Sequence, residues 1–321
     1  MSPLLSLCLT TLDRESLFPQ TLRSLASQTF PDLEIVVVDN ASRTDYARQA
    51  VAALNDPRIR FLRQSERVSM GDNWNRAVAL SRGRYVAVCH DDDLYHPLFA
   101  GETVDRLERD PSLAFVHTKT LRADEEGVPF AFCDLGWPER VEGRVFRRRM
   151  ALHPRRSLVE AQSVVMRRSA FDAAGPFVRD WVQVTDAEMW QRLAEHGAVG
   201  FLRRPLVTVR LRVAPKAASR RHVQELEEKA ELARRSARLL SPAERLLVRG
   251  RLDAVVAEQL LWTLLYADAP YLREEAPRML AQASRPLRMA LTPLVSGAQT
   301  QPLRAALTWL AKQRRARQGR S

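Results

Sequence analysis

Short apolar stretches alternate with amphipathic stretches along the first hundred residues. The apolar stretches have the length of strands, and the one at residues 34–39 (EIVVVD) is β-branched, as in a strand buried on both faces. We predict strands at residues 4–9, 34–39, 59–62 and 85–89, and helices at residues 18–28, 45–54 and 72–80, the last of them ended by Gly83. This order predicts an α/β fold with a largely parallel sheet and helices on both faces.

The second half of the chain is more mixed. It predicts helices at residues 97–109 and 185–195, a short helix ending at 175–176, loops and a hairpin at 124–145, and strands at 113–118, 162–166, 200–202 and 207–213. After Pro215 the strand signals stop, and residues 220–321 have a helical composition that we expect prolines 242, 270, 277, 286, 293 and 302 to interrupt. We therefore predict one domain at residues 1–215, with halves at 1–100 and 101–215, and a helical extension at 216–321.

The net charge of +12 is concentrated in that extension. Residues 216–321 hold 20 of the 50 Lys and Arg but only 10 of the 38 Asp and Glu. A basic extension suits an anionic partner such as a membrane surface, a nucleic acid or a polyanionic glycan, although solvated helix faces explain it equally well. No interleaving of aromatic and basic residues suggests single-stranded nucleic acid binding, so we expect no nucleic acid partner. The apolar segment at 259–266 favours a core or a homodimer seam over a helix that inserts into a membrane surface.

Several protein classes lack their sequence signals. The chain has no GxGxxG, GxxxxGK[ST] or GxSxG motif, which argues against a Rossmann dehydrogenase, a P-loop NTPase and an α/β-hydrolase. The three cysteines and six histidines show no metal-ligand spacing, and Cys8 and Cys89 lie in apolar runs as small buried residues. No uncharged apolar run is long enough to span a bilayer, and no leader peptide is evident. We therefore expect a cytoplasmic protein, with peripheral contact at the inner membrane face left open.

Carboxylates follow two of the predicted strands. Asp39 ends the strand at 34–39, and Asp91, Asp92 and Asp93 follow the strand at 85–89. Because ligands bind beyond the carboxyl ends of parallel strands, we expect these side chains to lie near one another. Adjacent carboxylates are stable together when a divalent cation neutralises them, and Mg²⁺ or Mn²⁺ held this way keeps positions open for phosphate. A solvated acidic loop, and a turn at Asp39-Asn40, are the structural alternatives.

Two helix starts carry further polar groups. At residues 185–188, Thr185 and Glu188 have the spacing of a capping box, while the helix dipole would keep Asp186 ionised and able to act as a general base. At residues 73–76, Arg76 could face phosphate, whereas Trp74 suits the core. Residue types alone do not separate these alternatives.

Taken together, these features resemble the family 2 glycosyltransferases of the GT-A fold. The resemblance runs from about residue 4 to about residue 213. The matching segments are LCLTTLDR at 7–14, SLASQT at 24–29, EIVVVDNAS at 34–42, GDNWNRA at 71–77, RGRY at 82–85 and TDAEMW at 185–190. The resemblance implies an inverting transfer of a sugar from a nucleoside diphosphate donor, linked to UDP or dTDP, to a hydroxyl acceptor. The acceptor would be a glycan or a lipid-linked molecule in bacterial polysaccharide or glycoconjugate synthesis.

The resemblance also implies roles for individual residues. Asp39 would hold the nucleobase, Thr11 would line the nucleoside, and Asp186 would take the acceptor proton. Asp92 would bind the divalent cation with Asp93, and Asp91 would support the nucleotide-sugar site. Arg76 and Arg212 would contact the diphosphate.

The sequence departs from the family pattern at several positions. His90 replaces the first Asp of the family's D-x-D-D, Thr185 replaces the Glu before the catalytic Asp, and Ala214 replaces the His of Y-R-x-H. Two alternatives therefore stay open. One is a degenerate, non-catalytic binding module. The other is a nucleotidyltransferase, which would normally need glycines that residues 13–16 lack.

Overall fold

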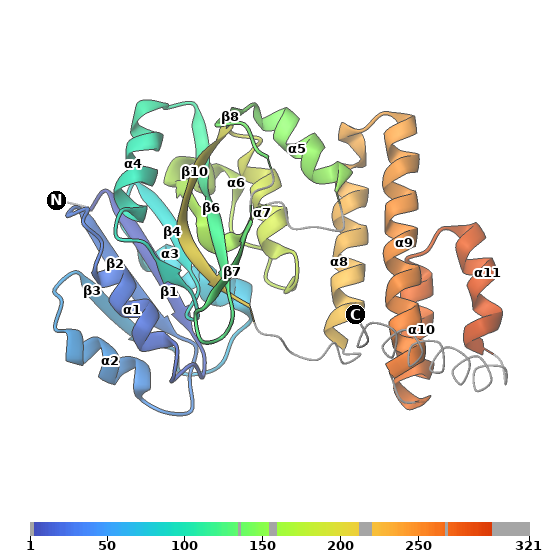
Figure 1. Cartoon of the computed structure of the whole chain (residues 1–321), viewed down its shortest axis with the longest axis horizontal. Helices are drawn as coiled ribbons and strands as arrows, with labels where there is room; N and C mark the ends of the chain where they lie inside the picture. Colours follow the sequence, from blue (N-terminus) through green and yellow to red (C-terminus); the bar gives the residue numbers. More distant parts are fainter. Residues whose placement is uncertain (1–2, 134–135, 154–158, 212–219, 267–268, 297–321) are drawn as a thin grey trace, which may run out of the picture. The chain divides into compact units, whose positions relative to one another are not determined.

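A computed structural model describes residues 3–133, 136–153, 159–211, 220–266 and 269–296 (Figure 1). The chain divides into two compact units. The first comprises Met1–Met150 and Ser157–Val213, and the second comprises Ala151–Arg156 and Ala214–Ser321. The predicted boundary near residue 215 falls in the segment 212–219, which lies outside the described residues.

The first unit is built on a sheet whose N-terminal half is parallel, as predicted. The four strands of this half are β1 (Leu5–Thr11), β2 (Leu33–Asp39), β3 (Ile59–Arg63) and β4 (Tyr85–Cys89). They lie in the order β3-β2-β1-β4, and β1 pairs in parallel with β2 and β4. Every residue of β2 is buried, which confirms the expectation of a strand covered on both faces. Thr11 lies opposite Asp39 in the register, so two strands deliver polar side chains to one edge.

The other half of the sheet is mixed. Its strands are β5 (Leu94–Tyr95), β6 (Leu113–Ala123), β7 (Pro129–Cys133), β8 (Arg140–Val141), β9 (Val164–Arg167) and β10 (Ala198–Arg210). The sheet continues past β4 as β9-β6-β10-β5, with β7 paired to β6 and β8 to β10. β6 and β10 run parallel, whereas β9 is antiparallel to both β4 and β6. The two short strands predicted at 200–202 and 207–213 belong to one long strand that ends at Arg210, with irregular pairing after Ala198 and around Pro205. Residues 212–213 lie outside the described residues.

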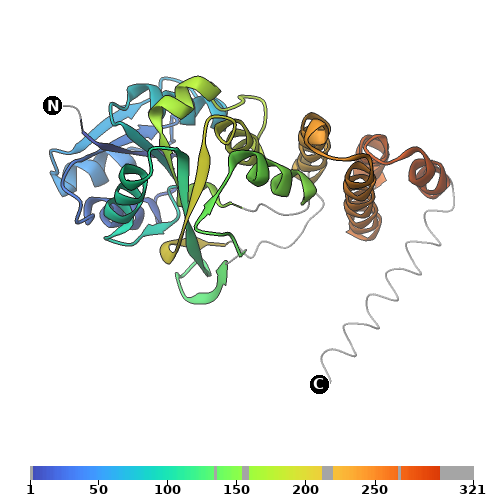
Figure 2. The same ribbon diagram turned by 90° about the horizontal axis from the view of Figure 1, so that it is seen from above.

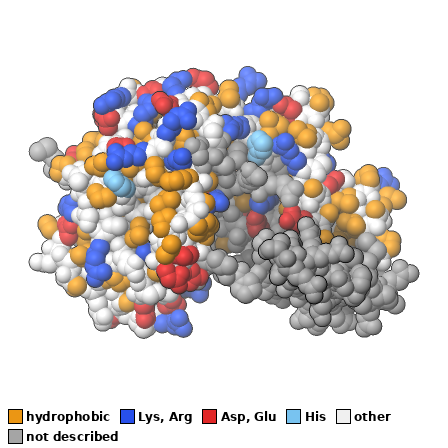
Figure 3. All heavy atoms as spheres, viewed as in Figure 1, with side chains coloured by type: hydrophobic (Ala, Val, Ile, Leu, Met, Phe, Trp, Pro, Cys, Tyr) orange, Lys and Arg blue, Asp and Glu red, His pale blue; other side chains and the backbone are white. Residues whose placement is uncertain are grey.

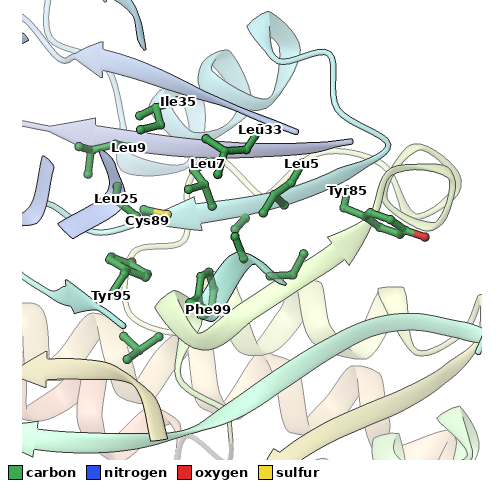
Figure 4. Close-up of a cluster of buried hydrophobic side chains, with 14 of the residues drawn as sticks. Leu5, Leu7, Leu9, Leu25, Leu33, Ile35, Tyr85, Cys89, Tyr95 and Phe99 are labelled. Carbon is green, nitrogen blue, oxygen red and sulfur yellow. The ribbon is translucent and has the colours of Figure 1, made fainter. Parts of the chain in front are cut away.

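Helices cover both faces of this sheet (Figure 2). They are α1 (Phe18–Ala26), α2 (Tyr46–Leu54), α3 (Met70–Leu80), α4 (Phe99–Arg109), α5 (Gly143–Leu152), α6 (Arg168–Ala174) and α7 (Thr185–Leu193), with a 3₁₀ turn η1 at Ala161–Ser163. On one face, α1, α2 and α4 pack against alternate residues of the parallel strands, among them Leu5, Leu7, Leu9 and Ile35 (Figure 4). The α3 helix contacts β1, β2 and β4.

The predicted end of α3 and the predicted start of α7 agree with the structure, but the capping residues expected there were wrong, and the helix α5 was not predicted. Gly83 does not end α3. The helix stops at Leu80, with Ser81 as an extended C-cap, and a Cβ at Gly83 would lie 2.6 Å from the Ser6 nitrogen. Thr185 does not cap α7. Val184 is the N-cap, and the Thr185 hydroxyl donates to the Val178 carbonyl. The α5 helix lies partly within the stretch expected to be loop, because Phe146 anchors it beside Phe115 and Trp137.

The second unit is helical, as its composition indicated. Its helices are α8 (Arg220–Ser236), α9 (Pro242–Tyr266), α10 (Ala269–Ala281) and α11 (Arg285–Ser296), with a 3₁₀ turn η2 at Ala237–Leu239. Pro242 begins α9, but Pro277 and Pro293 lie inside helices that we expected them to interrupt. Leu260 is buried in the core of this unit and Leu261 is 42% exposed.

None of the described helices is long and apolar enough to cross a membrane. On the face shown in Figure 3, basic and acidic side chains are interspersed over the described surface. Cys8 and Cys89 are buried free thiols, as predicted.

Candidate active site

The carboxyl ends of β1, β2 and β4 bring the predicted polar residues together. Thr11, opposite Asp39 in the register, donates its hydroxyl to the Asp91 Oδ2 at 2.6 Å. The backbone nitrogen of Asn40 donates to the Thr11 carbonyl, which ties the ends of the two strands to each other. The expectation that Asp39 and the 91–93 segment lie close together is therefore confirmed.

Asp39 is a buried carboxylate with one occupied and one open oxygen. Its Oδ1 accepts hydrogen bonds from the backbone nitrogen and the hydroxyl of Ser42. Its Oδ2 has no hydrogen-bond partner, although the Arg63 guanidinium lies 3.5 Å away. The turn interpretation of Asp39 is therefore correct for one oxygen. The second oxygen forms an ion pair with Arg63 but receives no hydrogen bond, so it can accept one from a ligand.

Asp91 holds the loop that follows β1. Its Oδ2 accepts from both the Thr11 hydroxyl and the Leu12 nitrogen, and Arg14 lies 3.5 Å from its Oδ1. Burial raises the pKa of Asp91 to about 6, although these hydrogen bonds act in the opposite direction. Arg14 also lies 3.5 Å from the Asp92 Oδ2, so it bridges two neighbouring carboxylates.

His90, Asp92 and Asp93 form a compact group of ligand atoms, all within 4.8 Å of one another. The Asp93 Oδ1 accepts from the Arg210 nitrogen at 2.9 Å, whereas its Oδ2 is buried without a hydrogen-bond partner. Burial and the charge of Asp92 raise the pKa of Asp93 well above its ordinary value. The His90 Nε2 is also buried without a partner, and burial lowers the pKa of this imidazole. Two carboxylates and a neutral imidazole are donors that suit a divalent transition metal such as Mn²⁺.

The sequence alone did not indicate that His90 belongs to this group. We noted it only as a departure from D-x-D-D, and the six histidines show no ligand spacing. The structure shows why it lies there. The His90 ring stacks on Trp74 of α3, with ring centroids 5.5 Å apart and an angle of 27° between the planes. Trp74 is in the core, as predicted, and it also fixes the orientation of His90.

Arg210, at the end of β10, is distant in the sequence but contacts Asp92 and Asp93. Its backbone nitrogen binds Asp93, its Nη1 donates to the Asp92 carbonyl at 3.2 Å, and its Nη2 donates to Gln20 at 2.6 Å. The guanidinium is largely buried, because the residue is only 7% exposed. No motif pointed to Arg210, since its role depends on β10 entering the sheet beside β5 and β6.

Asp186 lies in the first turn of α7, half-buried, and its Oδ1 accepts from the Ala187 nitrogen at 2.7 Å. The loop before α7 is fastened to α3, since the Asn75 amide binds both the nitrogen and the carbonyl of Phe177. The Phe177 ring lies 5.2 Å from Trp74, which stacks on His90. A continuous set of contacts therefore connects the α7 loop to His90 of the candidate metal-ligand group.

The structure describes only one of the two arginines predicted to contact diphosphate. Arg76 is exposed on α3, and the structure gives it no ion pair or hydrogen bond to any described residue. Arg212 lies outside the described residues.

Comparison with known proteins identifies the family. The model of glycosyl transferase family 2 matches residues 6–172, just over half of the chain. The chain therefore belongs to this family.

Individual proteins extend the comparison. Chondroitin synthase of Escherichia coli is 33% identical over 127 residues, which are 39% of this chain and 18% of that protein. Residues 1–349 of Staphylococcus aureus TarS, in complex with UDP-GlcNAc, align with a TM-score of 0.58 at 16% identity, covering 99% of this chain and 92% of that one. A mannosyltransferase of Pyrobaculum calidifontis, in complex with GDP-Man and Mn²⁺, aligns with a TM-score of 0.56 at 18% identity, covering 97% and 86%. These structures show the GT-A fold. The chain spans less than two thirds of the length of its leading curated relatives.

Proposed function

We propose that this family 2 glycosyltransferase carries out an inverting transfer of a sugar from a nucleoside diphosphate donor to a hydroxyl acceptor in bacterial polysaccharide or glycoconjugate synthesis. The observation that supports the proposal most is that two groups of polar residues lie next to each other at one edge of the sheet. Asp39 and Thr11 offer a nucleoside site, and Thr11 bonds directly to Asp91, next to the His90, Asp92 and Asp93 group.

The nucleoside would bind at β1 and β2. The open, buried Oδ2 of Asp39 can accept an N–H of the base, and Ser42 keeps the carboxylate in place. Thr11 would line the nucleoside. A pyrimidine such as uracil or thymine offers one ring N–H for this contact, as required of a donor linked to UDP or dTDP. Guanine also carries a ring N–H, so GDP is included in the titration below.

His90, Asp92 and Asp93 would hold a divalent cation. The buried, unpartnered Asp93 Oδ2 and His90 Nε2 fit this role, because groups left without partners are costly unless a ligand satisfies them. When bound, the cation would neutralise charge on the diphosphate leaving group. Asp91 would hold the Thr11–Leu12 loop against the nucleotide, and Arg76 and Arg212 are candidates for further diphosphate contacts.

Asp186 would take the proton from the acceptor hydroxyl. Its position in the first turn of α7 favours the ionised carboxylate through the helix dipole, and its half-buried side chain remains accessible. The α3 contacts described above keep its loop beside the ligand group. In-line attack opposite to the leaving diphosphate would invert the anomeric centre.

The helical extension would serve this enzyme as an accessory region. We keep residues 1–215 as the catalytic domain and 216–321 as the extension, with a glycan or lipid-linked acceptor. The same proposal includes a cytoplasmic location and a homodimer. It also includes peripheral contact of the basic extension with the inner membrane face.

Calorimetric titration of UDP, dTDP and GDP, with and without Mn²⁺, tests the site. We expect one nucleotide to bind in a metal-dependent way, and Asp92→Ala to remove that dependence. Asp72→Ala is the matched control, since Asp72 is an α3 surface carboxylate paired with Arg179. If no nucleotide binds under any metal condition, the proposed function fails, and a non-catalytic binding module replaces it.

A further inference from the structure

Arg14 lies in the loop between β1 and α1, beside the candidate metal-ligand group. Its guanidinium is 3.5 Å from the Asp91 Oδ1 and 3.5 Å from the Asp92 Oδ2, and 27% of its side chain is exposed. Asp92 is also one of the three residues whose ligand atoms lie within 4.8 Å of one another. Arg14 and a bound divalent cation would therefore both be attracted to Asp92, and the proposed function gives Arg14 no role.

The backbone of Arg14 is held independently of its side chain. The Arg14 nitrogen donates to the Tyr46 hydroxyl at 3.1 Å, and the Arg14 carbonyl accepts from the Phe18 nitrogen at 3.0 Å. Neither contact involves the guanidinium. The guanidinium can therefore leave Asp92 by rotation of the side chain, while the loop keeps its place.

The two ion pairs of Arg14 are long enough to exchange readily. A charge-assisted hydrogen bond from a guanidinium to a carboxylate is about 2.7–2.9 Å long, whereas both distances here are 3.5 Å. Partly exposed ion pairs contribute little to stability. A divalent cation carries twice the charge of a guanidinium, so Asp92 would gain more from the cation than from Arg14.

The surroundings of Asp92 are rich in negative charge. Burial and the charge of Asp92 raise the pKa of Asp93, and the charge of Glu160 acts in the same direction. Glu160 is fixed by β6, because its Oε2 accepts from the Thr120 hydroxyl at 2.6 Å. Arg14 acts against this accumulation of charge.

The effect of Arg14 on its neighbours has the sign expected of a counter-ion. Burial raises the pKa of Asp91, and the charge of Arg14 lowers it. Burial also lowers the pKa of His90, and the charge of Arg14 adds to this effect. The guanidinium therefore stabilises the ionised carboxylate and the neutral imidazole, which are the forms that bind a metal.

We propose that Arg14 is the counter-ion of Asp92 in the metal-free protein, and that it gives Asp92 up to the divalent cation and pairs with the diphosphate instead. The proposal rests on the proposed function. Binding of the cation alone costs the ion pair of Arg14, so the free protein binds the cation weakly. A nucleoside diphosphate gives the released guanidinium a new anionic partner, since guanidinium and phosphate match in geometry. Arg14 is therefore a positioning residue that makes the cation and the diphosphate bind cooperatively.

Binding of Mn²⁺ alone to the full chain at pH 7.5, followed by the electron paramagnetic resonance signal of the free ion, tests the competition. Arg14→Gln removes the charge, so we expect it to bind Mn²⁺ about three- to tenfold more tightly than wild type. Arg14→Lys keeps the charge and should stay close to wild type. Arg43→Gln is the matched control and should not change the affinity, because Arg43 is 85% exposed and pairs with Asp13 of the same loop.

Calorimetric titration of UDP, dTDP and GDP, with and without Mn²⁺, tests the cooperativity. For the nucleotide that binds the wild type, Arg14→Gln should reduce the enhancement of binding by Mn²⁺ about three- to tenfold. An unchanged enhancement overturns the proposal. Equal Mn²⁺ affinity of Arg14→Gln and wild type, including no measurable binding by either, also overturns it.

Weaker Mn²⁺ binding by Arg14→Gln overturns the proposal as well, because Arg14 would then hold Asp92 in place for the cation instead of competing with it. Failure of the wild type to bind any nucleotide under any metal condition contradicts the proposed function. The comparison with Mn²⁺ alone still decides in that case whether Arg14 competes for Asp92.

Discussion

Asp91 should make the metal-free protein less stable as the pH rises. The shift in its pKa from 3.8 to about 6 corresponds to about 3 kcal/mol, since each pKa unit is worth about 1.4 kcal/mol. The folded protein binds this proton more tightly than the unfolded chain does. Ionisation of Asp91 therefore favours unfolding, and the stability present below the unfolded pKa is lost between about pH 4 and pH 6.

The substitution Asp91→Asn removes this ionisation. An amide oxygen can still accept from Thr11 and Leu12, so we expect near-equal stability of variant and wild type at pH 4. At pH 7.5 the variant should gain about 3 kcal/mol relative to wild type. Urea unfolding in EDTA, followed by tryptophan fluorescence at both pH values, measures the difference.

A matched carboxylate should behave in the opposite way. Arg58 lowers the pKa of Asp56, so the stabilisation from Asp56 is present at neutral pH and is lost on acidification. Asp56→Asn should therefore be less stable than wild type at pH 7.5. Equal pH dependence of the Asp91→Asn and wild-type proteins would refute the reasoning, because it would mean that Asp91 is not desolvated in the folded state.

Further predictions concern four single positions. Asp186→Asn should lower turnover by about 10²- to 10⁴-fold and leave nucleotide affinity unchanged in calorimetry, and a parallel loss of affinity would contradict a role as general base. Asp39→Ala should weaken nucleotide binding equally with and without Mn²⁺, unlike Asp92→Ala, and a purely metal-dependent effect would remove Asp39 from the nucleoside site. Gly83→Ala should destabilise the protein by about 1–3 kcal/mol in urea unfolding, because its Cβ would meet the backbone of Ser6. Gly250→Ala, inside α9 with open space around it, should instead stabilise by about 0.5–1 kcal/mol, and equal midpoints for the two alanine variants would contradict both expectations.

The sequence predicted the parallel half of the sheet well because its signals are local. The strand at 85–89 appears with the predicted bounds, since a short apolar run is flanked by Gly83 on one side and by Asp91 to Asp93 on the other. Motif positions at strand ends then placed Asp39 near Asp91 without any tertiary information.

What the sequence did not indicate depends on contacts between distant segments. Glu160 and Arg210 belong to no recognisable sequence motif. Glu160 is held by Thr120 of β6, and Arg210 lies at the end of β10, so both positions depend on how β6 and β10 pair in the sheet. The α5 helix was missed because its most deeply buried residue, Phe146, is surrounded by arginines and preceded by turn formers. Pro277 and Pro293 were expected to break helices, yet both are accommodated within them.

The contacts of Arg210 affect the order in which the site can form during translation. Arg210 binds Asp93, a residue 117 positions earlier, so a nascent chain presents its acidic cluster long before the segment that satisfies it is synthesised. Until β10 is released, β5 lacks its partner strand and the carbonyl of Asp92 lacks its donor. The Thr11 and Asp39 end of the site, at β1 and β2, can form early, whereas the contacts of Asp92 and Asp93 become complete only near the close of translation of the first unit.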